Sequence, residues 1–180
     1  MGYYVNITNS DFRIRSENKA AAYEAVCRIN APEYDHLKRG GSWGGDGKSE
    51  SWYSWMPADY PEQTETLEDV LQLLGFEFRI EDNGDITDLG YDNKIGNEEI
   101  FLLAMSPYVE DGSFIRWRGE DGLPWAHKFH DGTMTIHDIE EVIVDKAVQP
   151  IEKRRESCAI KLLIGDAHVE HTGVVARTSD

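Results

Sequence analysis

Three short glycine-containing turn sequences divide the second half of the chain into alternating apolar and polar segments. They are Asn83-Gly84, Gly119-Glu120-Asp121-Gly122 and Asp131-Gly132. Asn-Gly and Asp-Gly pairs tolerate the positive φ angles of tight hairpin turns, and Asn83-Gly84 in particular predicts a type I′ turn. Each turn therefore predicts two antiparallel strands joined by a few residues.

The segments beside these turns have the composition of strands. Residues 76–80 and 86–89 flank the first turn, and residues 113–118 and 125–129 flank the second. Within residues 113–118, Phe114 and Arg116 alternate with Ile115 and Trp117, which is the two-residue period of a strand with one buried face. A further strand is expected at residues 3–8, which are rich in aromatic and β-branched side chains.

Three helices are expected between the strands. Residues 20–29 place apolar side chains at three- and four-residue spacing, with Ser16 as the candidate N-cap. Thr66 and Asp69 fit a capping box, and Gly75 fits the left-handed end of that helix. Asn97 is the candidate cap of a third helix that runs to Met105. The order of elements predicts an α+β fold, an antiparallel sheet with helices packed on one face in a two-layer sandwich.

Charge divides the chain into an acidic body and a different tail. Residues 1–145 carry 12 basic and 29 acidic side chains, whereas residues 146–180 carry 6 and 5. We therefore expect an α+β acidic domain at 1–145 and a C-terminal extension at 146–180. The extension contains Pro150, a Lys153-Arg154-Arg155 cluster and an apolar run at 159–164. That run is expected to be a docked helix or strand, or an arm that forms a homodimer.

The formal net charge of −16 limits the classes of partner. Such a field repels the phosphates of nucleic acids and attracts basic surfaces, so we expect a protein partner with a basic surface and no direct nucleic-acid binding. The alternative is that the acidity serves only solubility. No apolar stretch is long enough for a membrane span, and the two cysteines lie far apart, so no membrane association and a cytoplasmic location are expected.

The sequence offers only weak candidates for catalysis. Gly47-Lys48-Ser49 resembles the end of a phosphate-binding loop, but Ser42 stands where that motif requires glycine. His168 and His171 could share a metal on a helix, although their surroundings are typical of a strand, where this spacing separates the rings. We therefore expect no enzyme activity, no cofactor and no metal. A metal-dependent hydrolase using these two histidines is the disfavoured alternative.

A glycine-rich stretch at residues 39–47 precedes an aromatic cluster at residues 52–56. Five glycines in nine residues predict a loop, because glycine adds to the entropy lost when a regular element forms. The aromatic cluster is expected to belong to the core, with an exposed binding surface as the alternative. In a second functional hypothesis, a nucleotide or similar small molecule is sequestered in an aromatic pocket. Its candidate residues are Arg39, Trp43, Lys48, Trp52 and Trp55.

Several segments of residues 1–145 resemble a group of small phage-borne proteins. The likeness is carried by the MGYxV start and by an RGEDGxxWxxxF segment that begins at Arg118. Residues 52–56, 75–77 and 111–115 add to it, and the extension after residue 145 is not matched. The resemblance brings no activity. It implies a non-virion phage protein made to alter host physiology or to blunt host defence.

Charge and resemblance together give the leading hypothesis. The chain is expected to be a non-enzymatic phage accessory protein that binds and inhibits a host defence protein, in the manner of an acidic nucleic-acid mimic. The carboxylates expected to contact the partner are presented on the sheet and its loops. They are Asp82, Asp85, Asp111, Glu120 and Asp121.

Overall fold

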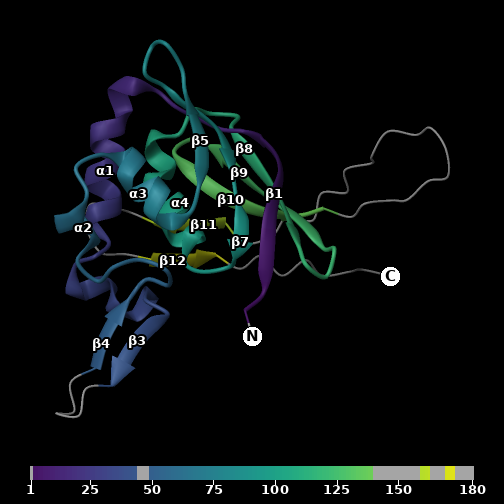
Figure 1. Ribbon diagram of the computed structural model, residues 1–180. Helices are drawn as coiled ribbons and strands as arrows, with labels where there is room; N and C mark the ends of the chain where they lie inside the picture. The colour runs from purple at the N-terminus through teal and green to yellow at the C-terminus, as the bar shows by residue number, and fades with distance from the viewer. Residues whose placement is uncertain (1, 44–48, 140–158, 163–168, 173–180) are drawn as a thin grey trace.

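The computed structural model describes residues 2–43, 49–139, 159–162 and 169–172, and its main element is an antiparallel sheet (Figure 1). The strand order is β12-β11-β10-β9-β8-β1-β7. The bounds are β1 Tyr4–Asp11, β7 Asp92–Lys94, β8 Phe114–Gly119, β9 Pro124–His130, β10 Thr133–Asp138, β11 Ala159–Leu162 and β12 Val169–Thr172. The predicted antiparallel meander is confirmed in β8, β9 and β10.

Two smaller sheets accompany the main one. β2 (Arg13–Ile14), β6 (Ile86–Gly90) and β5 (Glu77–Ile80) form a three-stranded sheet in that order. β3 (Gly40–Trp43) and β4 (Ser49–Trp52) form a separate hairpin. The prediction of a loop over the glycine-rich stretch is therefore wrong for residues 40–43. The glycines suit a strand here because a Cβ at Gly40 would meet the Trp52 indole Nε1 at 2.5 Å.

The helices lie on one side of the main sheet, which makes the fold the predicted α+β two-layer arrangement (Figure 1). The α-helices are α1 Lys19–Arg28, α2 Tyr60–Gln63, α3 Leu67–Leu74 and α4 Glu98–Met105. The 3-10 helices span Ser16–Asn18, Pro32–Leu37 and Ser106–Tyr108. None of the helices in the described residues has the length and apolarity that crossing a membrane requires.

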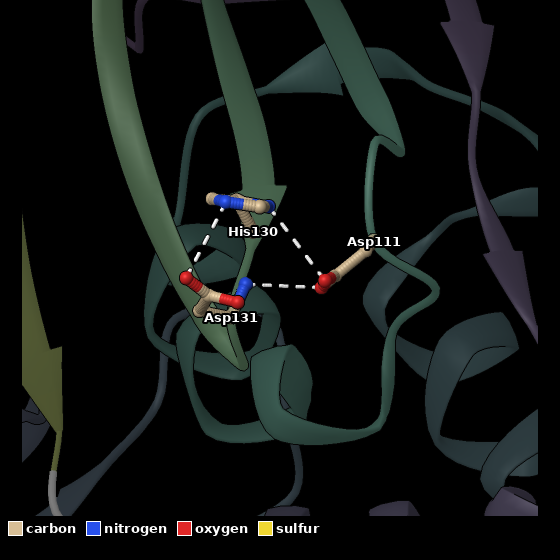
Figure 2. A group of neighbouring side chains, drawn as sticks. All are labelled: Asp111, His130 and Asp131. Carbon is tan, nitrogen blue, oxygen red and sulfur yellow. Dashed lines mark hydrogen bonds and ion pairs between the residues drawn. The ribbon is translucent and has the colours of Figure 1, made fainter.

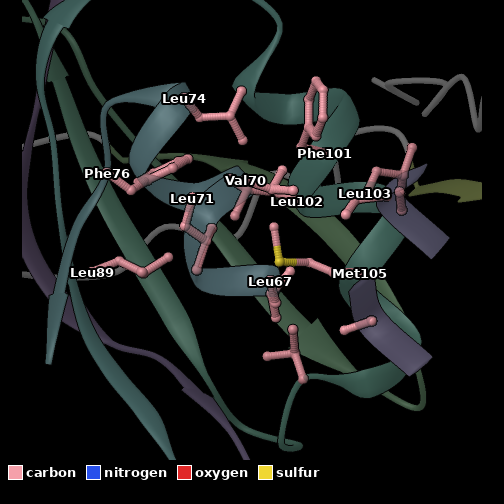
Figure 3. Packing of buried hydrophobic residues seen from close by; sticks show 14 of the residues in the cluster. Leu67, Val70, Leu71, Leu74, Phe76, Leu89, Phe101, Leu102, Leu103 and Met105 are labelled. Carbon is pink, nitrogen blue, oxygen red and sulfur yellow. The ribbon is translucent and has the colours of Figure 1, made fainter. Parts of the chain in front are cut away.

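The core lies between the helices and the sheet (Figure 3). α3 begins with the predicted capping box between Thr66 and Asp69, and Gly75 ends it with a φ of 89°. Its buried face consists of Leu67, Val70, Leu71 and Leu74. Almost every side chain of α4 is buried, because this helix packs against both α1 and β10. Tertiary burial therefore stabilises α4 on more than one face.

The hairpin turns differ from one another. Asp131 and Gly132 both have positive φ, of 50° and 67°, and form the expected tight two-residue turn. The type I′ prediction for Asn83-Gly84 is wrong, because only Gly84 has a positive φ, and its N–H donates to the Glu81 carbonyl. This longer connection is a type I turn followed by a bulge, in which glycine alone takes the left-handed position.

Neither of the two predicted N-cap side chains caps its helix. Ser16 lies in a 3-10 helix, and its backbone N–H donates to Asp85 rather than its hydroxyl capping α1. Asn97 does precede α4, but its side-chain oxygen accepts from the Ser54 N–H and its amide donates to the Leu37 carbonyl. Long-range bonds have replaced the local caps, since the Ser16 backbone and the Asn97 side chain join segments that are far apart in the sequence.

Part of the C-terminal extension adds to the edge of the main sheet. β11 pairs with β10, with Ile160 opposite Met134, and β12 pairs with β11. The Lys153-Arg154-Arg155 cluster lies outside the described residues, as do Pro150 and His168. The predictions of a dimerisation arm and of a domain boundary after residue 145 stay predictions.

Candidate functional site

The five carboxylates expected to contact a partner lie in two separate groups. Asp82 and Asp85 belong to the β5–β6 turn, and Asp111 lies just before β8. Glu120 and Asp121 belong to the β8–β9 turn, at the other end of β8. The five residues therefore do not form one continuous surface, and the turns rather than the strands present them.

Asp85 has a role inside the chain. It is 5% exposed, and its carboxylate accepts hydrogen bonds from the Ser16 N–H and from Arg13 Nη1, each at 2.9 Å. The Ser16 N–H, together with Arg13 and Asn83, holds the pKa of Asp85 below its usual value despite the opposing effect of desolvation. The carboxylate thus anchors the β5–β6 turn to the Arg13–Ser16 segment and is committed to internal bonds.

Asp121 is also engaged, although it is exposed. Its Oδ1 accepts the Tyr3 hydroxyl at 2.5 Å and the Leu123 N–H at 3.0 Å. These bonds lower the pKa of Asp121, and the Asp121 bond raises the pKa of Tyr3. The neighbouring Glu120 is exposed, and its backbone N–H donates to the Tyr4 carbonyl.

A polar groove of about 460 Å³ marks the end of the molecule that carries Asp82 and Asp111. It is lined by Arg13, Arg15, Ser16, Glu17, Asn83, Asp85 and Glu110. Both of its guanidinium groups form ion pairs, Arg13 with Asp85 and Arg15 with Glu110 at 3.0 Å.

We use the name acidic end for the three exposed carboxylates at this end of the molecule, Asp82, Asp111 and Asp131. Within the described residues, none of the three has an ion pair with lysine or arginine.

Two members of the acidic end surround a histidine (Figure 2). His130 Nδ1 lies 3.6 Å from Asp111 Oδ2, and its Nε2 lies 3.3 Å from Asp131 Oδ2. The Asp131 N–H donates to Asp111 at 2.9 Å, which joins the two turns. Three ligand atoms within 4.8 Å of one another could hold a cation. All three residues are exposed, and exposed acidic groups of this kind are common without a metal.

The alternative aromatic pocket is not assembled as the sequence suggested. Tyr53 and Met56 are buried, so that part of the aromatic segment belongs to the core as expected. Trp55 is 56% exposed with a φ of 68°, and Trp52 is half-buried in β4. The side chains of Trp43 and Lys48 lie outside the described part of the chain. Arg39 instead lines a different cavity.

This cavity lies between the main sheet and the first turn of α4. It is lined by Val5, Arg39, Ile95, Gly96, Asn97, Glu98, Glu99, Ile100, Trp117, Trp125 and His127, and its volume is about 80 Å³. The Trp117 and Trp125 rings are stacked, with centroids 6.1 Å apart. The Trp117 indole N–H donates to His127 Nδ1 at 3.1 Å. Cross-strand register forms this aromatic wall, since Trp117 pairs with Trp125 across β8 and β9.

His127 is the most perturbed titratable group of the cavity. It is 3% exposed, and burial lowers its pKa to about 4. The ring is therefore neutral at pH 7, and its Nε2 has no hydrogen-bond partner in the described part of the chain. A neutral imidazole can both donate and accept a hydrogen bond, so this ring can bind a polar group that enters the cavity.

Two glutamates begin α4 beside this cavity, and they differ. The Glu98 carboxylate is buried and accepts from the Tyr91 hydroxyl at 2.6 Å and the Gly96 N–H at 2.7 Å. Burial raises the pKa of Glu99, and the charge of Arg39 partly opposes that rise. Glu98 is therefore a structural group, whereas the side chains of Glu99 and Arg39 can form hydrogen bonds with a molecule in the cavity.

Comparison of the chain with models of known protein families, with curated proteins and with solved structures found no match. The resemblance to phage-borne proteins therefore stays a prediction.

Proposed function

We propose that this chain is a non-catalytic binding protein that uses its acidic end to bind a host protein with a basic surface. In the setting implied by the sequence resemblance, it is a phage accessory protein. It acts in the host cytoplasm and inhibits a defence protein by occupying a site made for nucleic acid. The observation that supports this proposal best is that Asp82, Asp111 and Asp131 lack a Lys or Arg partner in the described part of the chain, while Arg13 and Arg15 are already paired.

Exposed carboxylates are expected to affect the association with a partner more than the stability of the fold. An exposed ion pair contributes only about 0.2–1 kcal/mol, so one carboxylate alone would matter little. Several carboxylates on one surface, within a field of net charge −16, accelerate and orient the encounter with a cationic partner. The same field disfavours direct binding of DNA or RNA, because the phosphates carry the same sign of charge.

A capture experiment with two matched triple variants tests the proposal. The tagged full chain is incubated with bacterial host lysate at ~50 mM salt, where screening is weak, and bound proteins are quantified by mass spectrometry. The test variant is Asp82→Asn, Asp111→Asn, Asp131→Asn. The control is Glu120→Gln, Asp121→Asn, Asp138→Asn, which removes the same charge at the opposite end of the sheet.

We expect the wild-type chain and the control to enrich the same protein and the test variant to lose most of that enrichment. The two variants have equal net charge, so a difference between them reports the position of the carboxylates and not the overall field. If both variants retain the protein, or both lose it equally, the acidic end is not the binding surface.

A further inference from the structure

The cavity between α4 and the main sheet contains a buried hydrogen-bond donor for which the described part of the chain offers no acceptor. His127 Nδ1 accepts the Trp117 N–H, so the proton of the neutral imidazole must lie on Nε2. That Nε2 has no partner among the described residues. Leaving a buried donor unpaired carries a desolvation cost, which most buried polar groups in proteins avoid by forming a hydrogen bond. An acceptor atom from outside the chain would remove it.

The walls of the cavity favour a flat, mostly apolar occupant. Val5, Ile95 and Ile100 are aliphatic, and Trp117 and Trp125 offer indole rings. A volume of about 80 Å³ provides roughly six water-sized positions at 10–15 Å³ each, which suits a single ring and not a fused pair. Aromatic walls with a few polar groups are typical of sites for small molecules.

The other polar side chains of the cavity determine which donors and acceptors a bound ring must carry on its edge. Arg39 supplies further donors, and Glu99 supplies a carboxyl group that can accept a hydrogen bond. We propose that the cavity binds a planar six-membered heterocycle carrying a ring carbonyl beside a ring N–H, the chemistry of a pyrimidine base. The carbonyl oxygen accepts from His127 Nε2 or Arg39, and the ring N–H donates to Glu99. This site is separate from the acidic end and independent of the function proposed for it.

Three probes with one six-membered ring each separate the contribution of the ring N–H from that of the carbonyl groups. Isothermal titration calorimetry of the full chain is performed with uracil, with 1,3-dimethyluracil, which lacks the ring N–H, and with toluene, which lacks both polar groups. We expect uracil to bind at least ~10-fold more tightly than toluene, a difference of about 1.4 kcal/mol, with dimethyluracil between them. Toluene binding as tightly as uracil, or no heat with any probe up to ~10 mM, which means a dissociation constant weaker than ~10 mM, would overturn the proposal.

Variants assign the contacts. His127→Phe removes the donor and should weaken uracil at least ~10-fold, whereas His127→Gln keeps a donor and an acceptor and should stay within ~3-fold. Glu99→Ala serves as the second variant, because its half-buried side chain is less needed for folding, and it should weaken uracil but not dimethyluracil. His130→Phe, at the exposed end of the same strand, is the matched control. Unchanged uracil affinity in both His127→Phe and Glu99→Ala contradicts the assignment.

Discussion

Replacing Phe101 with alanine lowers the free energy of unfolding by about 3–5 kcal/mol. The ring is fully buried in α4 and contacts two aromatic rings from the segment before α3, with centroids 5.0 Å from Tyr53 and 5.6 Å from Tyr60. Its removal leaves a cavity that these two rings cannot fill, because their hydroxyls are held by the carbonyls of Ile29 and Val26. Urea denaturation followed by tryptophan fluorescence measures the change.

The matched control for this substitution is Leu73→Ala. Leu73 lies on the outer side of α3 and is 37% exposed, so its truncation should change the free energy of unfolding by less than about 0.5 kcal/mol. A loss below about 1 kcal/mol for Phe101→Ala would mean that Tyr53 and Tyr60 do not form core with α4. The aromatic segment would then be available as the exposed surface that the sequence left as an alternative.

Acidification from pH 7 to pH 4.5 destabilises the protein by about 2–3 kcal/mol through His127 alone. The pKa of this ring is about 4 in the folded chain and 6.5 in the unfolded chain, and each pKa unit corresponds to about 1.4 kcal/mol. Because the folded pKa is the lower one, the stabilisation is complete above pH 6.5 and is lost as the pH falls towards 4. Denaturation midpoints measured at half-unit pH steps reveal this slope.

Two glutamine variants isolate the histidine responsible. The glutamine in His127→Gln can still accept the Trp117 N–H but does not titrate. The loss of unfolding free energy between pH 6.5 and 4.5 should therefore be smaller in this variant than in the wild-type chain, by the contribution of His127. His130→Gln, on the same strand but exposed, should keep the wild-type slope. The carboxylates with lowered pKa values, Asp69, Asp85 and Asp121, titrate mainly below this window. Equal slopes in all three proteins would place the pH dependence elsewhere.

Local sequence patterns predicted much of the fold. The Thr66–Asp69 capping box, the left-handed Gly75 and the alternation along β8 all depend on residues a few positions apart, and all are confirmed. The β3–β4 hairpin was missed because the propensity of glycine argued for a loop. Close packing across the hairpin, with Trp52 lying over Gly40, overrode that propensity.

The candidate sites were harder to predict, because their contacts join distant segments. Asp85 was expected to face a partner, but it bonds Arg13, which is 72 residues away in the chain. Similarly, no local pattern placed Arg39 beside Trp117 and His127, since that cavity depends on strand register and on the position of α4. The Asp131-Gly132 turn was predicted, but its meeting with Asp111 around His130 requires the completed meander.

The central claim is that the acidic end, formed by Asp82, Asp111 and Asp131, binds a basic partner. The salt dependence of binding tests this claim most directly. The dissociation constant of the purified captured partner is measured from ~50 mM to ~500 mM salt, over which the Debye length falls severalfold. We predict that the wild-type complex weakens by ~100-fold or more, whereas the triple asparagine variant binds weakly at ~50 mM and changes little with added salt. A wild-type dissociation constant that stays the same across this range would contradict the claim.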